Sequence, residues 1–173
     1  MASRPLNNGY LLNTPLDFNG TLPSLNFPAD PAGLVRTEID DDLGIREFVL
    51  VKNDGVTDIA LGDCLVFVDD AKTLVRNFTD AAAGGLSVGA ALNRAAGVAI
   101  GAITVGNWGW IQTKGLHTSV KANGAVLNGQ MLTLDNTANT MVVPVALGTA
   151  APYTVVGVAT RDLAGTIRAR LTL

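Results

Sequence analysis

Proline is distributed very unevenly along this chain, and that distribution limits the possible folds more than any other sequence feature. Five of the seven prolines lie within the first 31 residues: Pro5, Pro15, Pro23, Pro28 and Pro31. Because proline fixes φ and has no backbone donor, this segment is unsuited to helices and central strands. The rest of the chain consists of short apolar runs separated by glycine turns. We therefore predict an extended N-terminal arm, residues 1–45, joined to a compact β domain, residues 46–173.

The arm is predicted to lie on a surface rather than to remain in solvent. It carries large apolar side chains of the kind that disordered, solvated segments lack, among them Tyr10, Leu12, Phe18, Leu22 and Phe27. About thirty extended residues reach on the order of 100 Å, which is far beyond the radius of a small domain. We expect these five side chains to form a partner interface, with an arm wrapped over its own domain as the alternative.

The β domain is predicted from apolar runs that end at turn residues. The expected strands are 48–52, 64–68, 71–78, 98–105, 108–113, 117–121, 130–134, 141–145, 153–159 and the C-terminal segment from 166, with a short helix or loop within 81–96. Turn dipeptides separate several of them: Asp54-Gly55, Gly106-Asn107, Asn123-Gly124 and Asn128-Gly129. Short strands with turns at this spacing indicate a mainly β fold, a compact antiparallel barrel or sandwich.

The C-terminal strand has the clearest pattern. Ile167, Ala169 and Leu171 alternate with Arg168 and Arg170. Because side chains alternate across a strand, we expect the first three to be buried and the two arginines to be exposed.

A faint internal echo links residues 61–69 with residues 127–135. Each segment has a leucine, a turn, an apolar strand and an aspartate in that order. The likeness is too loose to indicate a duplication.

Charge and composition exclude some classes of partner. Charged residues make up 16% of the chain and apolar residues 48%, whereas soluble domains average about 25% charged residues. Such a surface is expected to be covered in part by a partner. The net charge of −3 argues against nucleic acid and against an anionic membrane surface as that partner. Without a signal-peptide pattern or an apolar run of membrane length, the chain is expected to be made in the cytoplasm.

Catalytic chemistry finds little support. Residues 85–89 match the G-x-S-x-G pattern around Ser87, which in hydrolases carries a serine nucleophile. The only histidine is His117, and no acidic residue lies between it and Ser87, so an esterase is retained only as a hypothesis to be excluded. Cys64 lies in an apolar run and is predicted to be a small buried hydrophobe. We predict no catalytic residue and no cofactor.

Two other sets of residues have side chains of the kind that bind metal ions. Glu38, Asp40, Asp41 and Asp42 form the one acidic cluster, which could bind a hard cation. A solvated turn is favoured, and it could equally meet a basic patch on a partner. His117 alone cannot build a zinc site, so we expect a turn histidine with a backbone hydrogen bond. No metal site is predicted.

The pair Trp108 and Trp110 has two interpretations. On a strand these positions share one face, and two tryptophans on a shared face are most often core or a subunit contact. We therefore include both in the predicted partner interface. Stacking on a sugar is the alternative.

Several phrases in the second half of the chain resemble the capsid decoration, or cement, proteins of tailed bacteriophages. They are Gly97-Val98-Ala99-Ile100-Gly101, the run from Gly109 to Gly115, Asn128-Gly129-Gln130-Met131-Leu132 and Val156-Gly157-Val158-Ala159-Thr160. The likeness covers roughly residues 47–173 and does not include the arm.

The resemblance implies a structural virion protein that sits on the outer surface of the phage head. Its partners would be the major capsid protein, whose subunit contacts it would stabilise, and further copies of itself, with a homotrimer favoured over a dimer. The alternative is a head-fibre or adhesin-type binding module that recognises a host-surface glycan.

Overall fold

The computed structural model describes residues 4–5, 33–83, 94–134, 142–144, 155–160 and 163–173. In this part of the chain eleven strands form one hydrogen-bonded sheet, and the single helix, α1 (Phe78–Ala83), is short. The mainly β prediction is confirmed. The strands are β1 (Arg4–Pro5), β2 (Val35–Asp40), β3 (Gly44–Asn53), β4 (Cys64–Phe67), β5 (Leu74–Arg76), β6 (Ala95–Ala99), β7 (Trp108–Val126), β8 (Met131–Leu134), β9 (Val142–Pro144), β10 (Val155–Ala159) and β11 (Leu163–Thr172).

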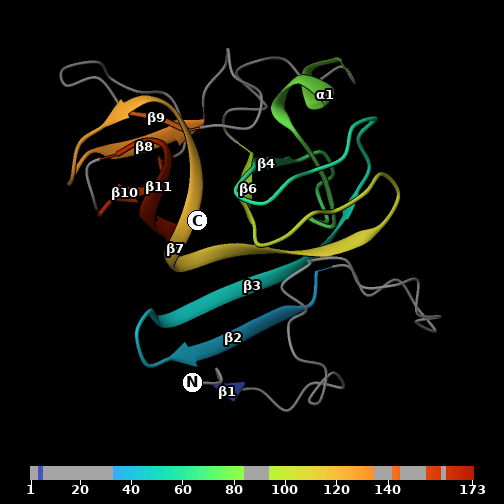
Figure 1. Cartoon of the computed structure of the whole chain (residues 1–173). Coiled ribbons are helices and arrows are strands. Elements are labelled where there is room, and N and C mark those ends of the chain that lie inside the picture. The colour runs from blue at the N-terminus through green and yellow to red at the C-terminus, as the bar shows by residue number, and fades with distance from the viewer. Residues whose placement is uncertain (1–3, 6–32, 84–93, 135–141, 145–154, 161–162) are drawn as a thin grey trace.

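The sheet closes on itself twice. A first ring runs β3-β5-β4-β6-β7 and is closed by pairing of β7 with β3, while a second runs β7-β11-β10-β8-β9 and is closed by pairing of β9 with β7. Within the rings only the β3–β5 and β7–β9 pairs are parallel. The 19-residue strand β7 belongs to both rings, and Figure 1 shows it bending from one to the other. The predicted compact antiparallel barrel is therefore present, as two small barrels that share a strand.

Each ring has its own apolar interior. Every strand of the first ring contributes to one buried cluster, together with two residues from loops: Val51, Ile59, Leu65, Val75, Ala96, Ala99, Ile103 and Ile111. The second ring encloses side chains of β7, β8, β10 and β11, including Val120, Leu132, Val156 and Ile167. Strand β4 lies between the two interiors, because its Leu65 belongs to the first cluster and its Cys64 and Val66 to the second. That position explains its unbroken apolar sequence.

The two rings repeat one topology. If β3, β4, β5, β6 and β7 are matched in order with β7, β8, β9, β10 and β11, every neighbour relation of the first ring recurs in the second, including its one parallel pair. Residues 61–69 and 127–135 contain the matched strands β4 and β8. The two segments of the echo therefore contain equivalent strands, although the sequence match is one residue out of step with the structural match.

Equivalent turns precede the matched strands β4 and β8. The Ala60 N–H donates to the Asp63 carboxylate at 2.7 Å, and the Leu127 N–H donates to the Gln130 amide oxygen at 2.8 Å. Gly62 and Gly129 each take a positive φ, +82° and +83°. The Asp63 carboxylate and the Gln130 amide oxygen thus accept equivalent hydrogen bonds, although the two residues are of different types.

The matched strands β6 and β10 carry the same Gly-Val-Ala sequence, 97–99 and 157–159. Each glycine lies against a neighbouring backbone. A Cβ at Gly97 would be 2.7 Å from the Gln112 carbonyl oxygen, and one at Gly157 would be 2.3 Å from that of Arg170. Close strand packing therefore requires the glycine of this sequence in both strands.

Several details differ from the sequence prediction. The strands expected at 108–113 and 117–121 are a single strand, β7. Strand β2 lies in the segment assigned to the irregular arm, because residues 35–40 alternate in character and follow the last proline of that segment. The expected strand 98–105 ends at Ala99. Asn123-Gly124 is not a hairpin turn: β7 continues through it, and the register against β11 shifts there as in a bulge.

Candidate interface

A two-stranded ribbon projects from the first ring. It consists of β2 and the first part of β3, residues 44–49, and Figure 1 shows it extending away from both rings. Its register pairs Ile39 with Ile45 and Val35 with Val49. Alternation along β2 therefore places Val35 and Ile39 on one face, and Arg36, Glu38 and Asp40 on the other.

The charged side chains on the other face of the ribbon form ion pairs with one another. Glu38 is only 1% exposed and lies 2.9 Å from the Arg36 guanidinium and 3.5 Å from that of Arg46. Arg46 also contacts Asp40 at 3.3 Å and lies over the Phe48 ring. A buried carboxylate needs such partners, because an unpaired charge is costly to bury. Two members of the predicted acidic cluster are thus structural.

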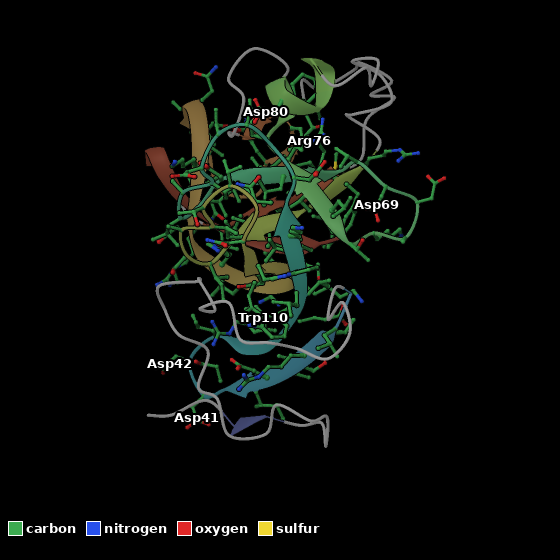
Figure 2. All side chains as sticks on the ribbon, turned by 90° about the vertical axis from the view of Figure 1, so that its right-hand side faces the viewer. Asp41, Asp42, Asp69, Arg76, Asp80 and Trp110 are labelled. Atoms are coloured by element: carbon green, nitrogen blue, oxygen red, sulfur yellow. The ribbon has the colours of Figure 1, made fainter. Side chains whose placement is uncertain are left out.

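The other two members of the acidic cluster form the tip of the ribbon. Asp40 closes the turn by accepting hydrogen bonds from the N–H groups of Asp42 and Leu43, both at 2.9 Å. These bonds, that from Leu43 first, hold the pKa of Asp40 below its ordinary value. Asp41 and Asp42 are exposed, and Figure 2 shows both at the end of the ribbon. We call this pair the acidic tip.

The acidic tip has the form of the solvated turn favoured by sequence reasoning. Across the described part of the chain, no three His, Cys, Asp or Glu side chains gather in a group that could hold a metal ion.

An apolar cluster lies where the ribbon joins the first ring. Phe48, Leu50 and Trp110 are buried, and Ile100 and Trp108 pack against them. Figure 2 shows Trp110 between the ribbon and the rings. The two tryptophans share a face, as predicted. Trp110 is 5% exposed and belongs to the core of this chain.

The opposite face of the ribbon is apolar and open. Val35, Ile39 and Ile45 are 52%, 41% and 64% exposed, and we call these three residues the open face. Beside Val35 the surface continues into a groove of about 580 Å³, whose walls include Val49, Phe67 and Leu173. Sequence reasoning missed the open face, although the alternation of residues 35–40 was its signal.

The outer edge of β2 is covered only in part. Strand β1 pairs antiparallel with β2, Arg4 opposite Ile39 and Pro5 opposite Glu38. Among the described residues, nothing pairs with residues 35–37 on that side. This edge differs from the strands of the two rings, whose closure leaves little edge free.

The N-terminal segment is attached to the ribbon at both ends. Residues 6–32 connect Pro5, beside β2, to Gly33, whose N–H donates to the Leu50 carbonyl at 2.8 Å. The predicted interface residues of the arm lie in this segment, outside the described residues: Tyr10, Leu12, Phe18, Leu22 and Phe27.

A glycine fixes the crossing of the ribbon over β7. Gly115 has φ +88°, and a Cβ on it would come within 2.3 Å of the Ile45 carbonyl oxygen. The ribbon thus rests on the backbone of β7 at the point where that strand passes from one ring to the other.

His117 and Cys64 are both buried. His117 lies within β7 rather than in a turn, and its Nδ1 accepts the Ser119 N–H at 3.1 Å. Burial lowers the pKa of His117 to about 4, against a hydrogen bond with the Ala99 backbone that raises it. Burial likewise raises the pKa of the Cys64 thiol, so that the thiolate is disfavoured.

A polar network at α1 satisfies itself. The Asp80 carboxylate accepts the N–H groups of Val56 and Thr57 and the Thr57 hydroxyl, at 2.9–3.2 Å. The Asp80 N–H in turn donates to Asn77, which caps the helix. Figure 2 shows Asp80 at the end of the molecule opposite the acidic tip. This network organises the loop after β3.

Comparison with protein-family models and with curated protein sequences finds no match. None of the helices in the described residues is long and apolar enough to cross a membrane. Ser87 and its glycine-rich pattern lie outside the described residues.

Proposed function

We propose that this chain is a structural virion protein that decorates the outside of a tailed-phage head and stabilises contacts between major capsid protein subunits. In this proposal it carries out no catalytic step and needs no cofactor. The phrases of residues 97–101, 109–115, 128–132 and 156–160 resemble those of decoration proteins and support the assignment.

One observation carries the proposal: among the described residues, β2 has an outer edge that is open at residues 35–37, on a ribbon that projects from two closed rings. An exposed edge accepts a further strand through main-chain hydrogen bonds, and it demands few particular side chains of its partner. Such an edge suits attachment to a repeated protein surface. The closed rings are the part displayed to solvent.

The N-terminal segment is the second element of the proposed attachment. It begins and ends at the ribbon, and its apolar side chains require cover. Its prolines restrict the unbound conformations, which lowers the entropy lost on docking. Many such contacts, repeated around the head, would give firm total attachment from individually weak ones.

Binding of a truncated chain to heads tests the proposal. The experiment mixes the chain with undecorated heads of the phage that encodes it and measures the bound fraction by co-sedimentation. We expect the full chain to bind and a chain without residues 2–31 to remain folded and unbound. The control is Asp80→Asn at the opposite end, compared at a pH and temperature where it is folded, which is expected to bind like the full chain.

Failure of the full chain to bind heads contradicts the proposed function. Equal binding by the truncated chain contradicts the role of the N-terminal segment and leaves the ribbon edge as the attachment. For the glycan-binding alternative, stacking needs an exposed aromatic face; Trp110 is buried and Trp108 is partly exposed, so only Trp108 could provide one.

A further inference from the structure

A second surface lies on the outer side of the second ring. Four residues are directly opposite one another across the adjacent strands β8, β10, β11 and β7: Met131, Val158, Arg170 and Leu116. Cross-strand partners point to the same side of a sheet. Arg168, two residues before Arg170, lies on this side as well. We call these five residues the basic row.

The basic row is open to solvent. Met131 is 49% exposed, both arginines are exposed, and Leu116 and Val158 are half-buried. No carboxylate of the described residues forms an ion pair with either arginine, whereas Arg36, Arg46, Arg76 and Arg94 all have one. Exposed arginines with no carboxylate partner among the described residues, beside exposed apolar side chains, are typical of a protein contact surface.

The fold does not require exposed arginines at these positions, because the equivalent positions of the first ring carry other, buried residues. Val98 of β6 pairs with Gln112, and the equivalent Val158 of β10 pairs with Arg170. By the same match Arg168 corresponds to Trp110. In the first ring both positions are buried, with Trp110 5% and Gln112 1% exposed. The second ring therefore keeps charged, exposed residues where its counterpart has core residues.

The ribbon carries residues whose charge is opposite to that of the basic row, together with aliphatic side chains. Its acidic tip presents Asp41 and Asp42, and its open face presents Val35, Ile39 and Ile45. One surface thus combines two carboxylates with aliphatic side chains, and the other combines two guanidiniums with aliphatic side chains. Among the described residues no ion pair joins the two surfaces within one chain.

We propose that the ribbon of one copy docks on the second ring of another, with the acidic tip against Arg168 and Arg170 and the open face against Leu116, Val158 and Met131. Because the two surfaces differ, the contact is head-to-tail, and it closes into a ring or extends as a chain according to its angle. It uses the face and tip of the ribbon, so the β2 edge and the N-terminal segment remain available for the head. The inference does not rest on the proposed function.

Charge reversal with complementation tests this contact. The experiment compares the full wild-type chain with Asp41→Lys/Asp42→Lys and with Arg168→Glu/Arg170→Glu by sedimentation velocity at low ionic strength. Like charges across the contact should weaken association of each variant by about tenfold or more. Mixing the two variants restores complementary charges wherever unlike copies meet, so the mixture should associate at least into mixed pairs. Added salt should weaken wild-type assembly.

Arg76→Glu is the matched control, because Arg76 lies on β5 near Asp80, outside both surfaces and outside the groove beside Val35. It should assemble like the wild type, and circular dichroism checks that all variants are folded. Variants that assemble as the wild type does, or a mixture that stays dissociated, would overturn the proposal. A wild type that stays monomeric at every concentration would do the same, while head binding measured separately would still decide the proposed function.

Discussion

At the scale of single residues, His117 shows how burial turns an ordinary side chain into a stability determinant. Its imidazole is 5% exposed and accepts the Ser119 N–H, an interaction that only the unprotonated Nδ1 can make. Burial, the largest cause, keeps its pKa near 4 in the folded chain, against an ordinary value of 6.5. The folded state therefore favours the neutral ring.

The sign of the resulting pH dependence follows directly. As the pH falls from 6.5 towards 4, the unfolded chain binds a proton at His117 and the folded chain does not, so folding stability decreases. The loss should be about 3 kcal/mol across this range. Urea unfolding at several pH values measures it. His117→Gln should remove most of this slope, and since the chain has a single histidine, an unchanged slope would contradict the assignment.

Residue patterns predicted much of the fold where side chains alternate or turns are local. The alternation in β11 was confirmed, with Ile167, Ala169 and Leu171 buried and both arginines exposed. The burial of Cys64 was confirmed as well. The open face was missed because the nearby prolines and the acidic cluster drew residues 35–45 into the predicted arm.

At the scale of elements, the attachment of the ribbon depends on how closely β3 crosses β7. Gly115 and Gly124 both belong to β7 and have nearly the same φ, +88° and +87°. A Cβ at Gly115 would be 2.3 Å from the Ile45 carbonyl oxygen, whereas one at Gly124 has nothing within 4 Å. Comparing a substitution at Gly115 with the same substitution at Gly124 therefore distinguishes the cost of a positive φ from the cost of steric overlap.

Substitution of each glycine by alanine tests this difference. Gly124→Ala should lower the free energy of unfolding by about 1 kcal/mol, from the positive φ alone. Gly115→Ala should lower it by about 3 kcal/mol or more, because the ribbon must also move away from β7. Denaturant unfolding gives the energies, and amide exchange should show faster opening of residues 44–49 in the Gly115 variant only. Equal effects of the two substitutions would contradict the account of the crossing.

Element pairing was the part of the fold that sequence reasoning could not supply. The parallel pairs β3–β5 and β7–β9 close the rings, and they join segments with no local turn between them. Asn123-Gly124 has hairpin chemistry, yet β7 passes through it because β11 pairs with residues on both sides. The local signal was present and tertiary pairing overrode it.

At the scale of the whole molecule, two rings of one topology carry different outer surfaces. The first buries Trp110 and Gln112 beside the ribbon, and the second exposes Arg168 and Arg170 at the matched positions. The two rings therefore share a topology but differ in their outer surfaces, which are buried at these positions in the first ring and exposed in the second. The ribbon and the edge of β2 lie at one end, and the α1 network lies at the other.

Electron cryo-microscopy of heads saturated with the chain tests the central claim most directly, because it shows which end of the molecule meets the shell. The account predicts density for the chain at junctions between major capsid protein subunits, with the edge of β2 and the N-terminal segment against the shell and α1 facing outward. Bound molecules that contact the shell through α1 and the rings, with the ribbon pointing into solvent, would contradict it.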